Sequence, residues 1–136
     1  MEIKDKSVKE LDALSQDIRD RIIDVVSRKG GHFSSTLGAV ELTLGMHYVF
    51  DVYSDPFIFD VSHQCYPHKL LTGRWEEFET VRQFGGLSGF TKPNESPADY
   101  FVAGHSSTSI SLAVGAAKAI ALKKEDRVPI VMIGDG

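Results

Sequence analysis

The apolar run Pro129-Ile130-Val131-Met132-Ile133 leads directly into Gly134-Asp135-Gly136. Such a continuous apolar run predicts a strand that is buried on both faces of a parallel sheet. Another short apolar run, Phe57–Val61, predicts a second buried strand. An aspartate that follows a strand is placed to bind a divalent cation, and neighbouring glycines leave room for phosphate oxygens. A plain turn after the strand is the alternative, because Gly-Asp-Gly is a common tripeptide.

Helical periodicity is clearest near the N-terminus. Ser7 and Glu10 form a capping box, and apolar residues then recur at helical spacing until Gly30-Gly31, which predicts the end of the helix. A second helix is predicted at Leu37–Val49, with cap oxygens from Ser34–Thr36. A short helix is predicted around Pro67, ending near Thr72-Gly73, and another at Trp75–Gln83. A last helix is predicted after Ser106–Ser109, with an apolar stripe formed by Ile110, Ala113, Val114, Ala117, Ile120 and Ala121. Residues 85–97 have neither period and predict a loop.

Helices that alternate with apolar strands predict an α/β fold. We expect part of an open, mostly parallel sheet with helices on both faces. Ligands of such sheets bind at the carboxyl ends of the strands. Ser62-His63 and Gly134-Asp135 both follow a predicted strand, so they fall at such ends.

Composition narrows the classes of function. The chain has 136 residues, of which 42% are hydrophobic and 25% charged, as in an ordinary globular domain. A net charge of −4 argues against a general nucleic-acid binder. Because Cys65 is the single cysteine, the chain forms no internal disulfide, which suits a reducing compartment. We interpret Cys65 as a small buried residue; a nucleophile or a metal ligand is the alternative. Without a signal sequence or a membrane-spanning run, we expect a cytoplasmic location.

Three short peptides pair a histidine with small residues: Gly30-Gly31-His32, Ser62-His63-Gln64 and Gly104-His105-Ser106. The last of these precedes a predicted helix, whose first backbone N–H groups favour anions. An imidazole at the end of a strand is able to bind a ligand or move a proton near neutral pH. Each peptide alone also fits a surface or helix-capping role. Together with Asp135 they indicate a diphosphate cofactor with a metal ion.

Other patterns point to structure rather than chemistry. His47 shares a helical face with Val40 and Leu44, which indicates a residue at the edge of the core. His68 has no partner that the sequence identifies, and its spacing from His63 does not suit a zinc pair on one helix. The chain has no phosphate loop, G-x-G-x-x-G, C-x-x-C, H-E-x-x-H or nucleophile elbow.

Four motifs occur in a fixed order: GGHFSS at 30–35, DVSHQCYPHK at 60–69, GHSSTSIS at 104–111 and GDG at 134–136. Together they resemble the N-terminal part of the 1-deoxy-D-xylulose-5-phosphate synthase family, thiamine-diphosphate enzymes of the transketolase superfamily. The likeness covers essentially the whole chain, including the loop Gly85–Phe90. Transketolase and the pyruvate dehydrogenase decarboxylase component share the last motif but lack the H-Q-x-Y-P-H-K and G-H-S-S-T-S-I-S runs.

The resemblance implies a reaction. Pyruvate loses carbon dioxide on thiamine diphosphate, and its remaining two carbons join glyceraldehyde 3-phosphate to give 1-deoxy-D-xylulose 5-phosphate, a precursor of isoprenoids, thiamine and pyridoxal phosphate. His32 would lie at the substrate end and assist proton transfer. His63 would contact the cofactor near its reactive ring or its diphosphate. Both are therefore candidate catalytic residues.

The same resemblance implies how the cofactor is held. Gly104, His105 and Ser106 would line the cofactor. Asp135 would bind Mg²⁺, and Gly136 would approach the diphosphate. These roles agree with the chemistry of the residues, because a diphosphate needs a cation and oriented donors. The family also implies a homodimer.

The sequence departs from the family pattern in two ways. Ser62 stands where the family usually has glycine, which adds a Cβ and a hydroxyl to the turn before His63. An asparagine that also binds the metal, a glutamate that activates the cofactor and arginines that hold the aldehyde phosphate would all lie beyond residue 136. We therefore expect residues 1–136 to be the N-terminal part of the diphosphate-binding domain of a larger enzyme, and to be inactive alone. Another transketolase-like enzyme and a non-catalytic phosphate-binding module remain alternatives.

Overall fold

The computed structural model describes residues 3–134. These residues form two compact units, one made of residues 3–50 and 64–89, the other of residues 51–63 and 90–134. The chain thus passes three times between the units, after residues 50, 63 and 89. In the part that the structure describes, no helix is both long enough and apolar enough to cross a membrane.

The first unit begins with helix α1, Val8–Lys29. Ser7 and Glu10 form the predicted capping box, in which the Ser7 amide donates to the Glu10 carboxylate over 2.8 Å. Gly30 ends the helix with a φ of 78°, a left-handed conformation that glycine adopts without strain. The predicted apolar face of α1 is buried at Leu14, Ile18, Ile22, Val25 and Val26. The capping and periodicity signals of this helix are thus confirmed.

The single helix predicted at Leu37–Val49 is divided in two. The short helix α2 spans Ser34–Leu37, and α3 spans Val40–Val49. The serines that were expected to cap the helix lie inside the first turn of α2 instead, and no side chain caps either helix. Gly38 lies at the break, where its low helix propensity favours an interruption.

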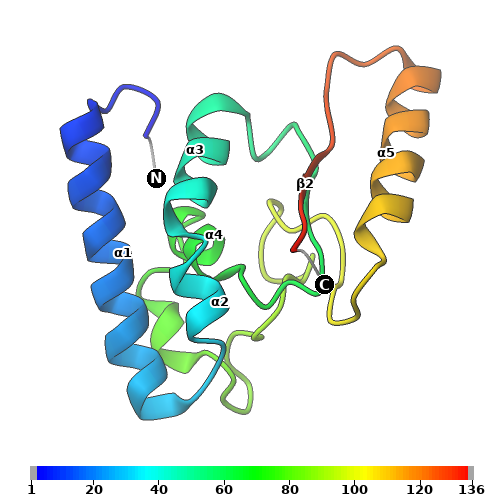
Figure 1. Cartoon of the computed structure of the whole chain (residues 1–136). Helices are drawn as coiled ribbons and strands as arrows, with labels where there is room; N and C mark the ends of the chain where they lie inside the picture. The colour runs from blue at the N-terminus through cyan, green and yellow to red at the C-terminus, as the bar shows by residue number, and fades with distance from the viewer. Residues whose placement is uncertain (1–2, 135–136) are drawn as a thin grey trace. The chain divides into compact units, whose positions relative to one another are not determined.

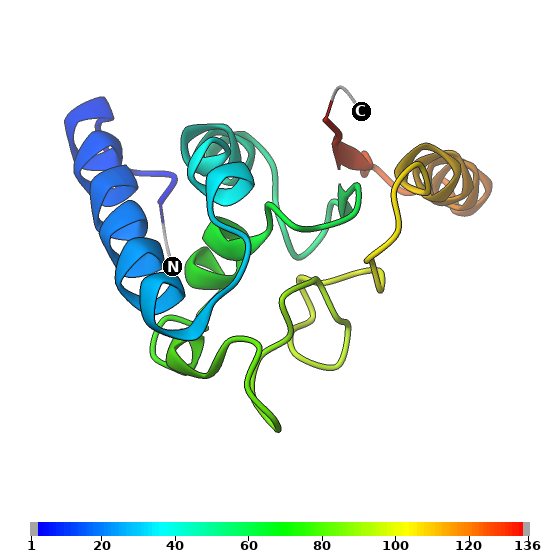
Figure 2. The ribbon, with the colours of Figure 1, turned by 60° about the horizontal axis from the view of Figure 1, so that its bottom comes forward.

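Two more elements complete the first unit. The helix predicted after Pro67 is α4, Tyr66–Leu71. The helix predicted at Trp75–Gln83 is reduced to one 3₁₀ turn, η1, Glu77–Thr80. Helix α1 packs against α3 and α4, and Figures 1 and 2 show α1 and α3 side by side.

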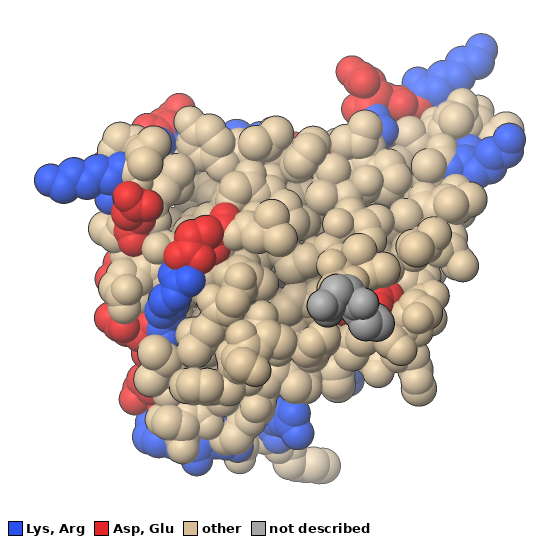
Figure 3. Space-filling model, viewed as in Figure 1, with Lys and Arg blue, Asp and Glu red and all other residues tan. Residues whose placement is uncertain are grey.

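Charged side chains line the outer face of α1 (Figure 3). One of its arginines, Arg28, donates to Glu79 of η1 over 2.6 Å. Hydrogen bonds from Arg28 hold the pKa of Glu79 at about 2, well below its ordinary 4.5. This ion pair fastens η1 to the end of α1.

The second unit contains a parallel sheet, as the sequence predicts. Strand β1, Phe57–Phe59, pairs with strand β2, Ile130–Met132, so that Ile58 lies opposite Val131. Both strands are shorter than predicted. Beyond β1, Val61 takes a left-handed φ of 55°, which turns the chain away from the sheet. The fold is an open α/β arrangement with a short parallel sheet.

Helix α5, Ser109–Lys123, contacts both strands. Its predicted apolar stripe is largely uncovered within this chain: Ile120 is buried, whereas Ile110 and Val114 are 62% and 65% exposed. The reason is size, because a helix of this length extends about 22 Å whereas each three-residue strand spans only about 10 Å. β2 is likewise half-buried at Ile130 and Val131 rather than buried on both faces. Residues 85–97 form neither helix nor strand, as predicted.

Candidate functional site

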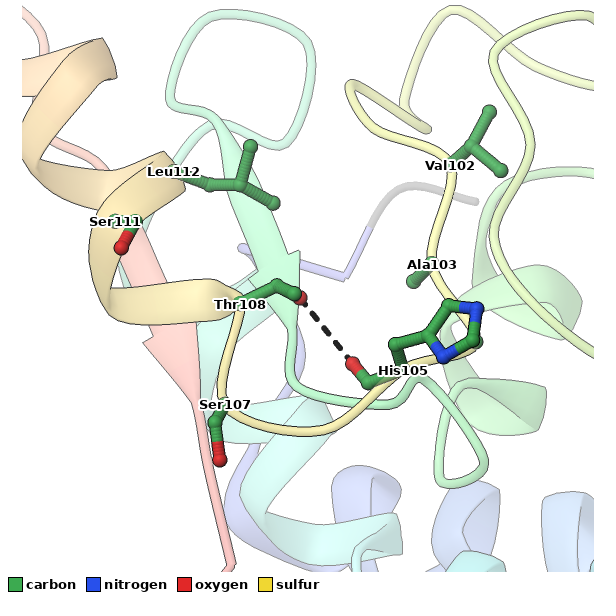
Figure 4. Close-up of a pocket in the computed structure, with 8 residues that line it drawn as sticks. Val102, Ala103, His105, Ser107, Thr108, Ser111 and Leu112 are labelled. Carbon is green, nitrogen blue, oxygen red and sulfur yellow. Dashed lines mark hydrogen bonds between the residues drawn. The ribbon is translucent and has the colours of Figure 1, made fainter.

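A pocket of about 520 Å³ lies in the second unit, where the chain enters α5 (Figure 4). Its volume is within the range of small-molecule and cofactor sites. The lining is apolar at one part of its wall and polar at another, and consists of Val102, Ala103, Gly104, His105, Ser107, Thr108, Ser111 and Leu112. The pocket therefore offers hydroxyl groups and an imidazole beside apolar surface, which suits a ligand with both polar and apolar parts.

An unusual backbone conformation and a side-chain hydrogen bond together shape the loop that lines this pocket. Gly104 has a φ of 147°, a conformation that other residues rarely adopt. Thr108 donates its hydroxyl to the carbonyl oxygen of His105 over 3.2 Å (Figure 4). Gly104 and His105 line the pocket, as Ser107 does; Ser106 is exposed and is not among the lining residues. The predicted motif thus supplies two of its three named residues to the wall.

His63 lies in a strained turn after β1. Val61 and Ser62 both have left-handed φ angles, 55° and 74°, which are unusual for residues other than glycine. Ser62 is fully buried, and its hydroxyl accepts the Thr91 amide over 2.9 Å and donates to the Thr91 hydroxyl over 3.1 Å. These bonds compensate for the left-handed backbone at a position where glycine would be expected. The half-buried His63 follows directly, at the carboxyl end of the strand.

His32 belongs to the first unit. Its backbone amide donates to the Tyr66 hydroxyl over 3.4 Å, and the two rings lie 5.8 Å apart. Tyr66 is fully buried and meets Phe78 edge-on at 5.2 Å. A Cβ on Gly31 would come within 2.8 Å of the Tyr66 hydroxyl, and Gly31 has a φ of 148°. Glycine is therefore required at Gly31 to bring the His32 turn onto Tyr66.

Comparison with known proteins decides the family. A family model described as 1-deoxy-D-xylulose-5-phosphate synthase matches residues 1–136. The chain is 88% identical to the 1-deoxy-D-xylulose-5-phosphate synthase of Aliarcobacter butzleri over 136 residues, which are all of this chain and 23% of that protein. This chain belongs to the 1-deoxy-D-xylulose-5-phosphate synthase family. The Nitratiruptor and Campylobacter hominis synthases are 75% and 69% identical, again over the whole of this chain and 23% and 22% of their own lengths. The chain thus spans about a quarter of the length of these relatives.

In this member of the synthase family, several pocket residues were not identified from the sequence. Ser111 and Leu112 line the pocket from the first turn of α5, and Val102 and Ala103 line it from the segment before Gly104. Asp60 was also missed: its carboxylate accepts the backbone amides of Ser107 and Ser109. No signal for this role was present in the sequence, because the predicted strand, Phe57–Val61, includes Asp60, whereas the observed strand β1 ends at Phe59.

The predicted metal ligand is not among the residues that the structure describes. Asp135 and Gly136 lie outside the described residues, and residues 3–134 contain no cluster of three or more His, Cys, Asp and Glu side chains that would hold a metal. The pocket lining includes no lysine or arginine. A diphosphate in this pocket would therefore need its charge balanced by a cation. The hydroxyl and imidazole groups of this pocket are able to donate hydrogen bonds to a phosphate group.

His47 and His68 form a separate, structural pair. His68 is fully buried and His47 is 7% exposed, and His47 Nε2 lies 3.0 Å from His68 Nδ1. Burial, followed by the charge of His68, lowers the pKa of His47 from 6.5 to about 3. The structural interpretation of both histidines is confirmed, and each supplies the partner that the sequence did not identify. Cys65 is likewise fully buried, and its thiol donates to the Gly89 carbonyl oxygen over 3.8 Å.

The His47 pair predicts a loss of stability in acid. Between pH 6.5 and about 3 the unfolded chain binds a proton at His47 that the folded chain does not, so folding weakens as the pH falls. The loss approaches about 1.4 kcal/mol for each pH unit within that window. Hydrogen exchange of α3 and α4 amides at pH 7 and pH 5 measures it. His47→Gln is expected to flatten this dependence; an equal slope in the variant would contradict the assignment.

Proposed function

We propose that this chain is the amino-terminal part of a thiamine-diphosphate-dependent transferase that joins pyruvate to glyceraldehyde 3-phosphate, with release of carbon dioxide, to give 1-deoxy-D-xylulose 5-phosphate. The observation that carries the proposal is the pocket built by the G-H-S-S-T-S run in a chain that belongs to this synthase family. The product would feed the synthesis of isoprenoids, thiamine and pyridoxal phosphate. We further propose a homodimeric, cytoplasmic enzyme.

Most of the site residues of this chain would bind and orient the cofactor rather than transfer protons. Thiamine diphosphate would supply the stabilisation of the carbanion that pyruvate leaves behind. Gly104 and His105 would contact the cofactor from the pocket wall. Asp135 would hold Mg²⁺, and Gly136 would allow the diphosphate to approach the backbone closely. The hydroxyl groups at the start of α5 would then donate hydrogen bonds to a diphosphate whose charge the cation has largely neutralised.

Two histidines would handle protons. His63 stands at the carboxyl end of β1, where ligands of α/β sheets bind, so it would face the cofactor. His32 would act at the substrate end, held by its amide bond to Tyr66 rather than by its ring alone. An imidazole suits this task because its ordinary pKa lies near neutral pH.

An assay of the full-length protein with pyruvate and glyceraldehyde 3-phosphate tests the proposal. Release of carbon dioxide together with the pentulose phosphate supports it. Turnover of ketose phosphates without pyruvate would instead indicate a transketolase-type enzyme. Phosphate binding without turnover would indicate a non-catalytic module. Residues 1–136 alone are expected to be inactive, because the groups that activate the cofactor and hold the aldehyde phosphate would come from other parts of the enzyme.

A further inference from the structure

A buried carboxylate underlies the pocket loop. Asp60 follows β1 directly and is 3% exposed. Its Oδ2 accepts the Ser107 amide over 3.1 Å, and its Oδ1 accepts the Ser109 amide over 3.2 Å. One side chain therefore satisfies two backbone amides where the pocket loop enters α5, although 47 and 49 residues separate the partners in sequence.

The loop needs such a restraint. Ser107 has a φ of 66°, in the left-handed region that a serine seldom occupies. Ser107 lines the pocket, and the exposed Ser106 precedes it. A strained residue persists only where its surroundings fix it. The bond from the Ser107 amide to Asp60 is a contact that fixes it.

Asp60 itself is held on the sheet. Its amide donates to the Met132 carbonyl over 2.8 Å, which extends the pairing of β1 with β2 by one bond. Its carbonyl accepts the Ser62 amide over 2.5 Å, inside the turn that presents His63. The residue thus ties together the sheet, the His63 turn and the pocket loop.

We infer that Asp60 is a positioning residue for cofactor binding: its carboxylate holds the loop from Gly104 to Thr108 in the conformation that forms the pocket. This inference rests on the proposed function, because the ligand is taken to be a diphosphate cofactor. Hydrogen bonds from the Ser107 amide and from Ser109 keep the pKa of Asp60 below its ordinary value, so the group is ionised at neutral pH.

The same geometry changes how an anion would bind here. The first amides of a helix attract phosphate groups. In α5 the Ser109 amide and the preceding Ser107 amide already donate to a carboxylate. A phosphate at those two amides would meet a negative charge. A diphosphate would therefore be held by side-chain hydroxyls and a cation, and the two amides at the start of α5 stabilise the loop rather than bind the ligand.

Asp60→Asn in the full-length protein tests the inference. The change keeps the shape but replaces one charged acceptor oxygen with a donor NH₂, so one amide loses its partner. We expect the Kd for thiamine diphosphate, measured by calorimetry with Mg²⁺ in excess, to rise about tenfold. In the protein without cofactor, the amides of Ser107 and Ser109 should exchange faster with deuterium. An unchanged Kd would overturn the inference and leave the proposed function standing.

Asp55→Asn is the matched control. Asp55 precedes β1 as Asp60 follows it, and its carboxylate also accepts two backbone amides, those of Asp51 and Val128, each over 3.0 Å. We expect this variant to lose protection at Val128 without any change in the Kd. An equal rise in Kd for both variants would mean that Asp60→Asn acts by destabilising the fold in general, and this would overturn the inference.

A second substitution separates positioning from folding. Glycine adopts a left-handed φ without strain, so Ser107→Gly should relax the need for the Asp60 restraint. The double variant Asp60→Asn/Ser107→Gly is expected to recover much of the lost affinity, and it remains informative where the single variant folds poorly. Affinity as low as that of the single variant would contradict a role through the loop. Wild-type protein that fails to bind thiamine diphosphate overturns the proposed function and this inference with it.

Discussion

Asp135→Asn in the full-length protein is expected to weaken thiamine diphosphate binding about a hundredfold or more when Mg²⁺ is present. Removing only the hydrogen-bond partner of a metal ligand typically lowers metal affinity about 10- to 100-fold. Here the proposed ligand itself loses its charge. The pocket lining offers no lysine or arginine to replace the cation. Calorimetric titration with thiamine diphosphate at fixed Mg²⁺ measures the effect.

The control for this variant is Asp126→Asn. Asp126 is an exposed aspartate that precedes β2, whereas Asp135 follows it. Its replacement makes the same change in net charge and should leave the affinity unchanged. Equal affinity of the Asp135→Asn variant and the wild-type protein would show that the metal ligand has been assigned to the wrong residue.

His32→Ala is expected to lower kcat about 10²- to 10⁴-fold, the contribution typical of a positioned acid or base. Alanine keeps the backbone amide that donates to Tyr66, so the turn is retained and only the imidazole is lost. The affinity for thiamine diphosphate should therefore stay the same. Steady-state kinetics with pyruvate and glyceraldehyde 3-phosphate, beside a calorimetric Kd, separates the two quantities.

Phe33→Ala provides the comparison for His32. Phe33 is the adjacent aromatic residue, is 44% exposed and has no proposed role. We expect its kcat to resemble that of the wild-type protein. A His32→Ala enzyme with undiminished kcat, or one whose loss lies entirely in cofactor affinity, would refute a role in proton transfer.

Local signals in the sequence predicted the elements that depend on local physics. The Ser7 capping box and the end at Gly30 are short-range hydrogen-bond and φ preferences, and both are present in α1. The strands at Phe57 and Ile130 were visible as apolar runs, and they pair in parallel as expected. Their lengths were not predictable, because the left-handed Val61 ends β1 through a turn that no β-branched residue favours.

The motifs of the site were predictable from the sequence, but the hydrogen bonds that hold these motifs in place were not. The sequence identified Gly104 and His105, and both line the pocket. It missed Asp60, because the bond to Ser107 joins positions 47 residues apart and arises only when the loop folds onto the sheet. The sequence has Ser62 at a turn position typical of glycine, but it did not reveal that hydrogen bonds to Thr91 would stabilise the left-handed backbone there.

The partnership of His47 with His68 shows the same limit. Each histidine was correctly interpreted as structural from its own surroundings. The bond between them, over 21 positions, depends on the packing of α3 against α4. Patterns within one element reveal which face is buried, whereas contacts between elements require the fold.

Hydrogen–deuterium exchange of the full-length protein, with and without thiamine diphosphate and Mg²⁺, tests most directly whether the pocket in this chain holds the cofactor. We predict that the cofactor slows exchange in residues 102–112, which contain the pocket lining, and in residues 134–136. Slower exchange confined to other parts of the protein, with these two segments unchanged at saturating cofactor, would contradict the proposed site.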